Sequence, residues 1–224
     1  MIQYTTHNFN RPIAWNIKRE PIYRILDDVK WMDNFFETGE LMLSCFQNFK
    51  NYKDEMQGDS EEGHGVLGNT DDKGNVSAYI YDSGSNAFVM STTAILSEEV
   101  IKDFKGKCAI KINHPTYFAL EVAKKLPFIS SGLEGHCDYI DSRVYFLDSE
   151  NENKQSFEKL DFNNDINSIE LFKEMTNGRE LFIKDSKYIH QNEYRLIWFS
   201  IKDVSASAFI KCPEAIAFCE PIIF

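Results

Sequence analysis

The chain has 224 residues, of which 43% are hydrophobic and 26% charged, a composition typical of a globular protein with a sizeable hydrophobic core. Its formal net charge of −11 excludes the class of nucleic-acid binders that depend on a positively charged surface. Charged or amide residues interrupt every apolar run before it reaches the length of a membrane helix, so we expect no membrane partner.

The cysteines are odd in number, widely spaced and mostly embedded in apolar runs, which predicts reduced thiols and a location in the cytoplasm. They are Cys45, Cys108, Cys137, Cys212 and Cys219. Residues 1–15 lack a basic segment followed by an apolar stretch, so we expect no secretory signal. Because no repeat and no Pro- or Gly-rich linker divides the sequence, we expect a single domain over residues 1–224.

The predicted strands are segments in which β-branched and aromatic residues lie between turn formers. In chain order they are residues 40–46, 76–81, 87–91, 107–113, 143–147, 180–184, 193–201 and 205–210. Because strands and helices do not alternate regularly, the order predicts an α+β fold with a split, mostly antiparallel sheet and a few flanking helices.

The helices are fewer, and their ends carry recognisable capping residues. A helix is expected at residues 31–38, a second at 97–104 with Ser97 as its N-cap, and a third at 114–125 with Pro115 in its first turn. The acidic, amide-rich segment 147–167 predicts a surface excursion that leads into a short helix at residues 169–175.

The segment 188–200 carries the strongest functional signal, because a polar approach ends at Glu193 and an apolar strand begins there. Alternation along this strand places Glu193, Arg195 and Ile197 on one face and Tyr194, Leu196 and Trp198 on the other. A carboxylate at the mouth of a strand is rigid and can still reach a ligand. The structural alternative is an edge strand on which Glu193 and Arg195 form cross-strand salt bridges.

The string Gln191-Asn192-Glu193-Tyr194 resembles the motif of ADP-ribosyltransferases, in which a Gln or Glu stands two positions before the catalytic Glu. It is especially similar to the Asn-Glu-Tyr of poly-ADP-ribose polymerases. The resemblance implies that Glu193 hydrogen-bonds the nicotinamide ribose of NAD and stabilises an oxocarbenium-like transition state. A fixed carboxylate suits this chemistry, because breaking the bond to a cationic leaving group builds positive charge on the ribose.

Two companions of this motif occur upstream in the order that the family shows. Arg24 lies in a weak strand-like segment, and the triplet Ser91-Thr92-Thr93 resembles the Ser-Thr-Ser of the arginine-using branch. The resemblance implies that Arg24 contacts the NAD phosphate or ribose, that Ser91 orients the nicotinamide ribose or supports the catalytic carboxylate, and that Thr92 and Thr93 complete the cofactor site. The structural alternatives are a surface arginine and a strand end that caps a helix.

Further residues are expected at the same site. The resemblance implies that Gln191 recognises the target, and a pyrophosphate site in an acidic protein needs local cations, for which Arg195 is a second candidate. NAD pockets of transferases use an aromatic platform, for which we expect Tyr79, Tyr81 or Tyr117.

A second resemblance covers more of the chain and is to a bacterial family of unknown function often found among mobile or defence genes. Its shared features are an early Tyr-Arg pair, a helix, a strand, an Asn-Asp-Pro-Phe-Glu-like loop, a central strand and a late Glu-Tyr-Arg strand. Here they correspond to Tyr23-Arg24, residues 31–39, 40–46, 53–58 and 87–91, and Glu193-Tyr194-Arg195. The resemblance implies the chain layout and supplies no chemistry.

The expected function is therefore an NAD-dependent ADP-ribosyltransferase-like or NAD-hydrolysing enzyme, a candidate toxin or phage-defence effector with an unknown macromolecular acceptor and no bound metal. One alternative is a metal-dependent nuclease that uses Asp59, Glu61, Glu62 and His64, because grouped carboxylates hold divalent cations. The other is a non-catalytic sensor or interaction module, in which the same residues only hold strands together.

Overall fold

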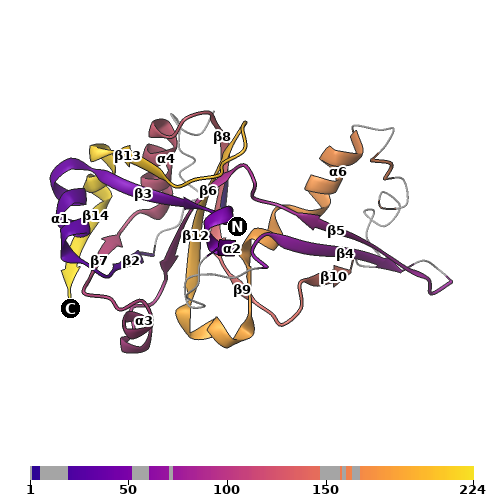
Figure 1. Cartoon of the computed structure of the whole chain (residues 1–224), viewed down its shortest axis with the longest axis horizontal. Helices are drawn as coiled ribbons and strands as arrows, with labels where there is room; N and C mark the ends of the chain where they lie inside the picture. The colour runs from indigo at the N-terminus through magenta and orange to yellow at the C-terminus, as the bar shows by residue number, and fades with distance from the viewer. Residues whose placement is uncertain are drawn as a thin grey trace.

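The computed structural model describes residues 2–5, 20–51, 61–70, 73–146, 157, 160–162 and 167–224. These residues form an α+β fold in which a nine-stranded antiparallel sheet is the largest element (Figure 1). The predicted α+β class and the mostly antiparallel pairing are confirmed. Two short pairings are parallel: β10 (Val144–Phe146) with β4 (His64–Thr70), and β11 (Ile183–Lys184) with β9 (Asp138–Tyr139).

The main sheet is built from strands that are far apart in the sequence. In spatial order its strands are β1 (Ile2–Thr5), β8 (Ile129–His136), β12 (Glu193–Ser200), β6 (Ala87–Thr93), β2 (Ile22–Leu26), β7 (Cys108–Ile112) and β14 (Cys219–Ile223). A side branch leaves β6 through β3 (Glu40–Cys45), which pairs with β13 (Ala208–Lys211).

The sheet forks at β6. One edge of β6 pairs with β12 over its whole length. Its other edge pairs with β2 only at Thr93 and with β3 only at Phe88 and Val89. Between these two pairings, residues 90–92 have no sheet partner on that edge in the part of the chain that the structure describes, so β2 and β3 diverge around an opening.

One face of the sheet carries the main hydrophobic core. It is covered by α1 (Val29–Thr38), α4 (Pro115–Lys125) and the 3-10 helix η3 (Pro213–Phe218). In α1, Asp28 accepts a hydrogen bond from the Lys30 N–H and so caps the start, and Gly39 at φ 75° ends the helix. Between these caps Met32 and Phe35, three residues apart, fall on the same side of the helix and enter the core.

The opposite face carries a second, smaller cluster that includes Phe46 of α2 (Phe46–Asn51), Val89 and Ile197. Beyond it, β4, β5 (Val76–Asp82) and β10 form a separate three-stranded sheet that extends to the right of Figure 1 together with α6 (Asn167–Thr176). Phe172 of α6 packs edge-on against Tyr81 of β5, which anchors the helix on this sheet.

Most of the expected elements are present. The strands near residues 40–46, 76–81, 87–91, 107–113, 143–147 and 193–201 and the four helices are observed within a few residues. α3 (Glu98–Asp103) begins at the predicted cap, where the Ser97 hydroxyl accepts from the Val100 N–H. Residues 147–156, part of the expected surface excursion, lie outside the described residues.

Other expectations are wrong. Residues 180–184 are mostly the 3-10 helix η1 (Arg179–Phe182), which starts after Gly178 at φ 68°, and the strand expected from residue 205 begins only at Ala208. The strands β4, β8 and β14 were not predicted. Glycines in β4 and β8 weaken the strand pattern, and Pro221 in β14 is tolerated because this strand lies at the end of the sheet.

The five cysteines are free thiols, as the sequence predicted. Burial raises the pKa of Cys212 to about 11 and that of Cys219 to about 12, which keeps both protonated near neutral pH. None of the helices in the described ranges combines the length and the hydropathy needed to cross a bilayer.

Candidate active site

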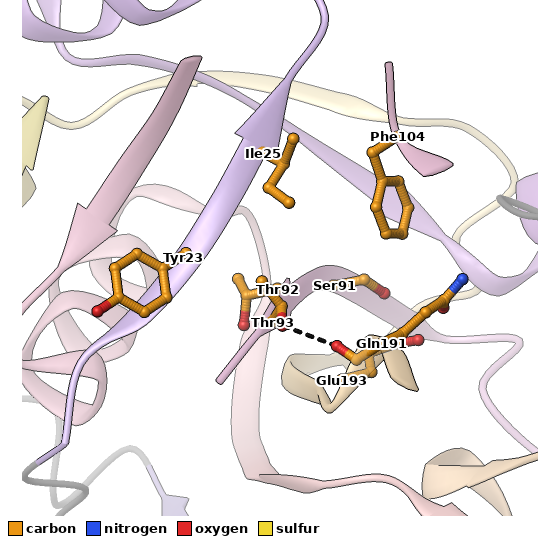
Figure 2. Close-up of a pocket in the computed structure, with 8 residues that line it drawn as sticks. All are labelled: Tyr23, Ile25, Ser91, Thr92, Thr93, Phe104, Gln191 and Glu193. Carbon is orange, nitrogen blue, oxygen red and sulfur yellow. Dashed lines mark hydrogen bonds between the residues drawn. The ribbon is translucent and has the colours of Figure 1, made fainter. Parts of the chain in front are cut away.

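A cleft lies at the fork of the main sheet. It consists of two adjoining cavities of about 320 Å³ and about 50 Å³, whose walls share Ile25, Ser91, Phe104 and Glu193. The larger cavity adds Arg24, Asp27 and Lys184 among others. Figure 2 shows the smaller cavity, with Ile25 and Phe104 on one side and Gln191 and Glu193 on the other.

The backbone of Ser91 faces the open edge of β6. The Ala94 N–H donates to the Asn192 carbonyl, which lies on the β12 side. Successive residues of a strand direct their N–H and C=O groups to opposite edges, so Ser91, three residues earlier, directs both of its groups toward the opening between β2 and β3. The cleft therefore offers a main-chain donor and acceptor beside the Ser91 hydroxyl.

The structure brings Arg24, Ser91 and Glu193 to this one cleft from three different strands. The Arg24 guanidinium donates through Nη2 to the Met42 carbonyl at 2.7 Å and so links β2 to β3 across the fork. The neighbouring Asp28 is ion-paired with Lys30 at 3.0 Å.

Glu193 is held by contacts on every side. Lys184 Nζ lies 2.5 Å from its Oε2 and Arg195 Nε lies 2.7 Å from its Oε1. Its backbone N–H donates to the Tyr139 hydroxyl at 2.6 Å, and its carbonyl accepts from the Cys137 N–H at 2.9 Å. Burial alone would raise the pKa of Glu193, but the charges of Arg195 and Lys184 outweigh burial and hold it far below the ordinary glutamate value.

Arg195 does not have the role expected of it. Its side chain is 1% exposed, and its Nη1 and Nη2 donate to the two carboxylate oxygens of Glu62 at 2.8 and 2.7 Å. Nη1 also donates to the Leu181 carbonyl at 2.6 Å. Because these bonds and the one to Glu193 occupy the guanidinium, Arg195 positions the carboxylate and is poorly placed to bind the phosphates of a dinucleotide.

These contacts form a buried series of alternating charges, which we call the charge chain: Glu62, Arg195, Glu193 and Lys184. Its last member, Lys184, also donates to Gln191 Oε1 at 2.6 Å. Salt bridges of Glu193 and Arg195 were expected only on an edge strand, whereas β12 lies inside the sheet, and the partners Lys184 and Glu62 were not predicted. Lys184 is contributed by a two-residue strand and Glu62 by a turn, so no local pattern identifies either of them as a partner of Glu193.

Thr92 and Thr93 line the smaller cavity, but their hydroxyls bond to the backbone. Thr92 Oγ1 donates to the Tyr194 carbonyl at 2.6 Å, and Thr93 Oγ1 lies 2.7 Å from the Gln191 carbonyl (Figure 2). Both threonines therefore tie β6 to the segment that carries Glu193. Because both hydroxyls are engaged in this way, a direct contact of either threonine with a cofactor is not favoured.

The aromatic platform expected at Tyr79, Tyr81 or Tyr117 is wrong. Tyr79 and Tyr81 pack against Phe172, and Tyr117 stacks on Phe218, so none of them lines the cleft. The rings in the cleft walls are Tyr23, Phe49 and Phe104. Tyr23 was within reach of sequence reasoning, since it forms the Tyr-Arg pair with Arg24.

The described part of the acidic loop, residues 61–64, is not organised as a metal site. Glu62 turns inward onto Arg195, Glu61 is exposed, and His64 Nδ1 pairs with Asp82 at 2.6 Å. Asp59 lies outside the described residues, as does the loop at residues 53–58. The described residues contain no group of three or more His, Cys, Asp or Glu that would hold a metal ion, so they lend no support to the nuclease alternative.

Comparison of the chain with known protein families, with curated proteins and with solved structures finds no match. The chemistry of the cleft must therefore be inferred from its own residues. It combines an ionised and rigidly held carboxylate, a serine with an open backbone edge, and a guanidinium in its wall. This set suits the stabilisation of a developing cation on a ligand that also carries negative charge.

Proposed function

We propose that the cleft binds NAD and breaks its nicotinamide glycosidic bond, as an ADP-ribosyltransferase-like or NAD-hydrolysing enzyme. The observation that supports this most is the convergence of Arg24, Ser91 and Glu193, which are distant in sequence, on one cleft. The order of these residues along the chain suggested the activity, and a chance match would have had no reason to gather them.

In this proposal Glu193 stabilises the positive charge that develops on the nicotinamide ribose as the bond breaks. Its low pKa keeps it ionised at neutral pH, so it acts by charge and does not remove a proton. Arg195 and Lys184 fix its position, and a fixed carboxylate needs no reorganisation when the charge appears.

The remaining cleft residues bind the rest of the ligand. Arg24 supplies the charge that neutralises a phosphate, and Ser91 supplies its hydroxyl and its open backbone groups to the ribose. The larger cavity, at about 320 Å³, lies at the lower end of the range for small-molecule sites, so it takes the nicotinamide riboside portion while the rest of the dinucleotide extends outward.

The test is release of nicotinamide from NAD by the full chain, with and without Glu193→Gln. We expect this variant to lower the rate at least about 100-fold, because it removes the charge that stabilises the transition state. Glu193→Gln also leaves Lys184 without its carboxylate, so the double variant Glu193→Gln/Lys184→Met, which leaves the Glu62–Arg195 pair balanced, should be folded and equally inactive.

The matched control is Glu214→Gln, the same substitution at an exposed carboxylate that pairs with Lys125 on α4. It should retain full activity. If the wild-type chain releases no nicotinamide and calorimetry detects no NAD binding, the proposal is wrong and the cleft belongs to a non-catalytic module.

A further inference from the structure

Gln191 carries a buried amide donor with no partner among the described residues. The residue is 1% exposed, and its Nε2 makes no hydrogen bond within the part of the chain that the structure describes. Lys184 fixes which end of the amide is the nitrogen, because an ammonium group only donates and its contact at 2.6 Å must therefore be with Oε1. Leaving a buried donor unsatisfied is unfavourable, and a bound ligand atom that accepts from it would remove this cost.

The donor lies in the wall of the smaller cavity. Figure 2 shows the Gln191 side chain extending toward the Phe104 side of this cavity, with Ser91 and Glu193 beside it. A volume of about 50 Å³ accepts a water molecule or one oxygen-bearing group of a larger molecule. The cavity thus places a hydrogen-bond donor next to the carboxylate on which the proposed reaction depends.

The donor restricts what this cavity binds. A guanidinium or ammonium group presents only donors, which would face both Gln191 Nε2 and the nearby Lys184 charge. Hydrogen bonds from such a cation to Glu193 would compete with those from Lys184 and Arg195, which its two oxygens already accept, whereas the stabilisation of the ribose needs only the charge of Glu193. A neutral or anionic oxygen, in contrast, satisfies the buried donor.

We propose that the acceptor of the ADP-ribosyl group at this site is an oxygen nucleophile, with water as its simplest form, and that Lys184 is the positioning residue that sets this preference by orienting Gln191. The inference rests on the proposed function and specifies the class of acceptor that receives the ADP-ribosyl group after nicotinamide leaves. It specifies the target recognition expected of Gln191, because Lys184 occupies the amide oxygen and leaves the amide nitrogen to meet the acceptor.

With water as the nucleophile the step balances without another reactant. The bond between ribose C1′ and the nicotinamide nitrogen breaks, and its electron pair leaves with neutral nicotinamide. The water oxygen forms the new bond to C1′, and its proton passes to solvent through the cleft while Glu193 stays ionised. The products are ADP-ribose, nicotinamide and one proton.

The test measures how the ADP-ribosyl group is divided among competing acceptors: ¹⁸O-labelled water, a serine peptide and agmatine, whose guanidinium is a nitrogen nucleophile. We expect wild-type products with ¹⁸O at C1′ or an ADP-ribosylated serine hydroxyl, and no ADP-ribosyl-agmatine. Lys184→Met frees the Gln191 amide to turn and should yield ADP-ribosyl-agmatine at a share at least about tenfold above the detection limit. This ratio does not depend on how much of the variant is folded.

Lys187→Met is the matched control, because Lys187 is an exposed lysine of the neighbouring 3-10 helix η2 (Ser186–Gln191). It should leave the division of products unchanged. Transfer to agmatine by the wild-type chain, or an unchanged ratio in Lys184→Met, overturns the inference while nicotinamide release still supports the proposed function.

A second measurement does not need turnover. The ¹⁵N signals of the Gln191 side-chain amide, identified by their loss in Gln191→Leu, should shift on addition of sodium formate and not on addition of guanidinium chloride at equal ionic strength. Shifts caused by guanidinium alone would refute the oxygen preference even if the chain consumed no NAD.

Discussion

The two faces of β12 are built on different principles, although they belong to the same eight residues. On one face Tyr194, Leu196 and Trp198 enter the main hydrophobic core. On the other, Glu193 and Arg195 belong to the charge chain and only Ile197 joins an apolar cluster. Both faces are buried, so burial alone does not distinguish them.

The two faces are expected to lose stability in different ways when a side chain is substituted. Apolar packing loses stability in proportion to the atoms removed and to the cavity left behind. A buried ion pair repays its desolvation only while both partners are present, so removing one partner costs more than removing both. On the apolar face the loss of stability should therefore grow with the number of atoms removed. On the charged face, removing one charge should destabilise the whole set of paired charges.

The largest expected effect is that of Arg195→Met, which leaves the carboxylates of Glu62 and Glu193 buried without their shared cation. We expect a loss of about 5 kcal/mol in the free energy of unfolding, measured by urea denaturation. Arg179→Met, at a half-exposed arginine 3.6 Å from Asp138, should cost less than about 1 kcal/mol. A similar small loss for both variants would contradict the idea that the charged face acts as a unit.

Next is Trp198→Ala on the apolar face, with an expected loss of about 4 kcal/mol. Trp198 is fully buried, and its Nε1 donates to the Ala119 carbonyl of α4 at 2.9 Å. Trp198→Phe keeps a ring and leaves that carbonyl without its donor, so it should lose about 2 kcal/mol. If the two variants were equally destabilised, the response would not be graded.

Coupling on the charged face is tested by a double-mutant cycle between Glu193 and Lys184. Glu193→Gln should cost about 3 kcal/mol, because it leaves the Lys184 ammonium buried without a carboxylate. Glu193→Gln/Lys184→Met should cost less than Glu193→Gln alone, since the remaining Glu62–Arg195 pair is balanced. Additive losses from the two single variants would show that the contact at 2.5 Å carries no coupling.

The sequence predicted much of this strand and little of what surrounds it. Alternation from Glu193 to Trp198 assigned each residue to the correct face, because the period of a strand is a local property. The position of Glu193 at the start of the strand also predicted a carboxylate that reaches a ligand, whereas the residue is only 5% exposed. Burial depends on β9, β11 and the turn at Glu62, which come from elsewhere in the chain.

The candidate site shows the same limit. Arg24, Ser91 and Glu193 were identified because their motifs and chain order resemble those of a known family, and the cleft contains all three. Lys184 and Phe104 were missed, because a lysine at the end of a short strand and a phenylalanine after a helix carry no pattern of their own. A residue whose role depends on a contact with a partner distant in sequence can be identified only from the folded structure.

The smallest expected effect is the pH dependence of the charge chain. Because the pKa of Glu193 is lower in the folded chain than in the unfolded one, the unfolded state takes up the proton first as the pH falls. The stabilisation from ionised Glu193 is therefore complete above the ordinary glutamate pKa of about 4.3 and is lost progressively below it, toward the folded pKa.

The free energy of unfolding is measured by urea denaturation from pH 7 to pH 3, for the wild-type chain and for Glu193→Gln/Lys184→Met. The difference between the two proteins should be constant down to about pH 4. Below that pH the wild type should lose stability relative to the variant. The exposed carboxylates with lowered pKa values, Asp28, Glu214 and Glu220, are common to both proteins and cancel in this difference. A difference that stayed constant down to pH 3 would mean that Glu193 titrates in its ordinary range in the folded chain and that the two cations do not hold it.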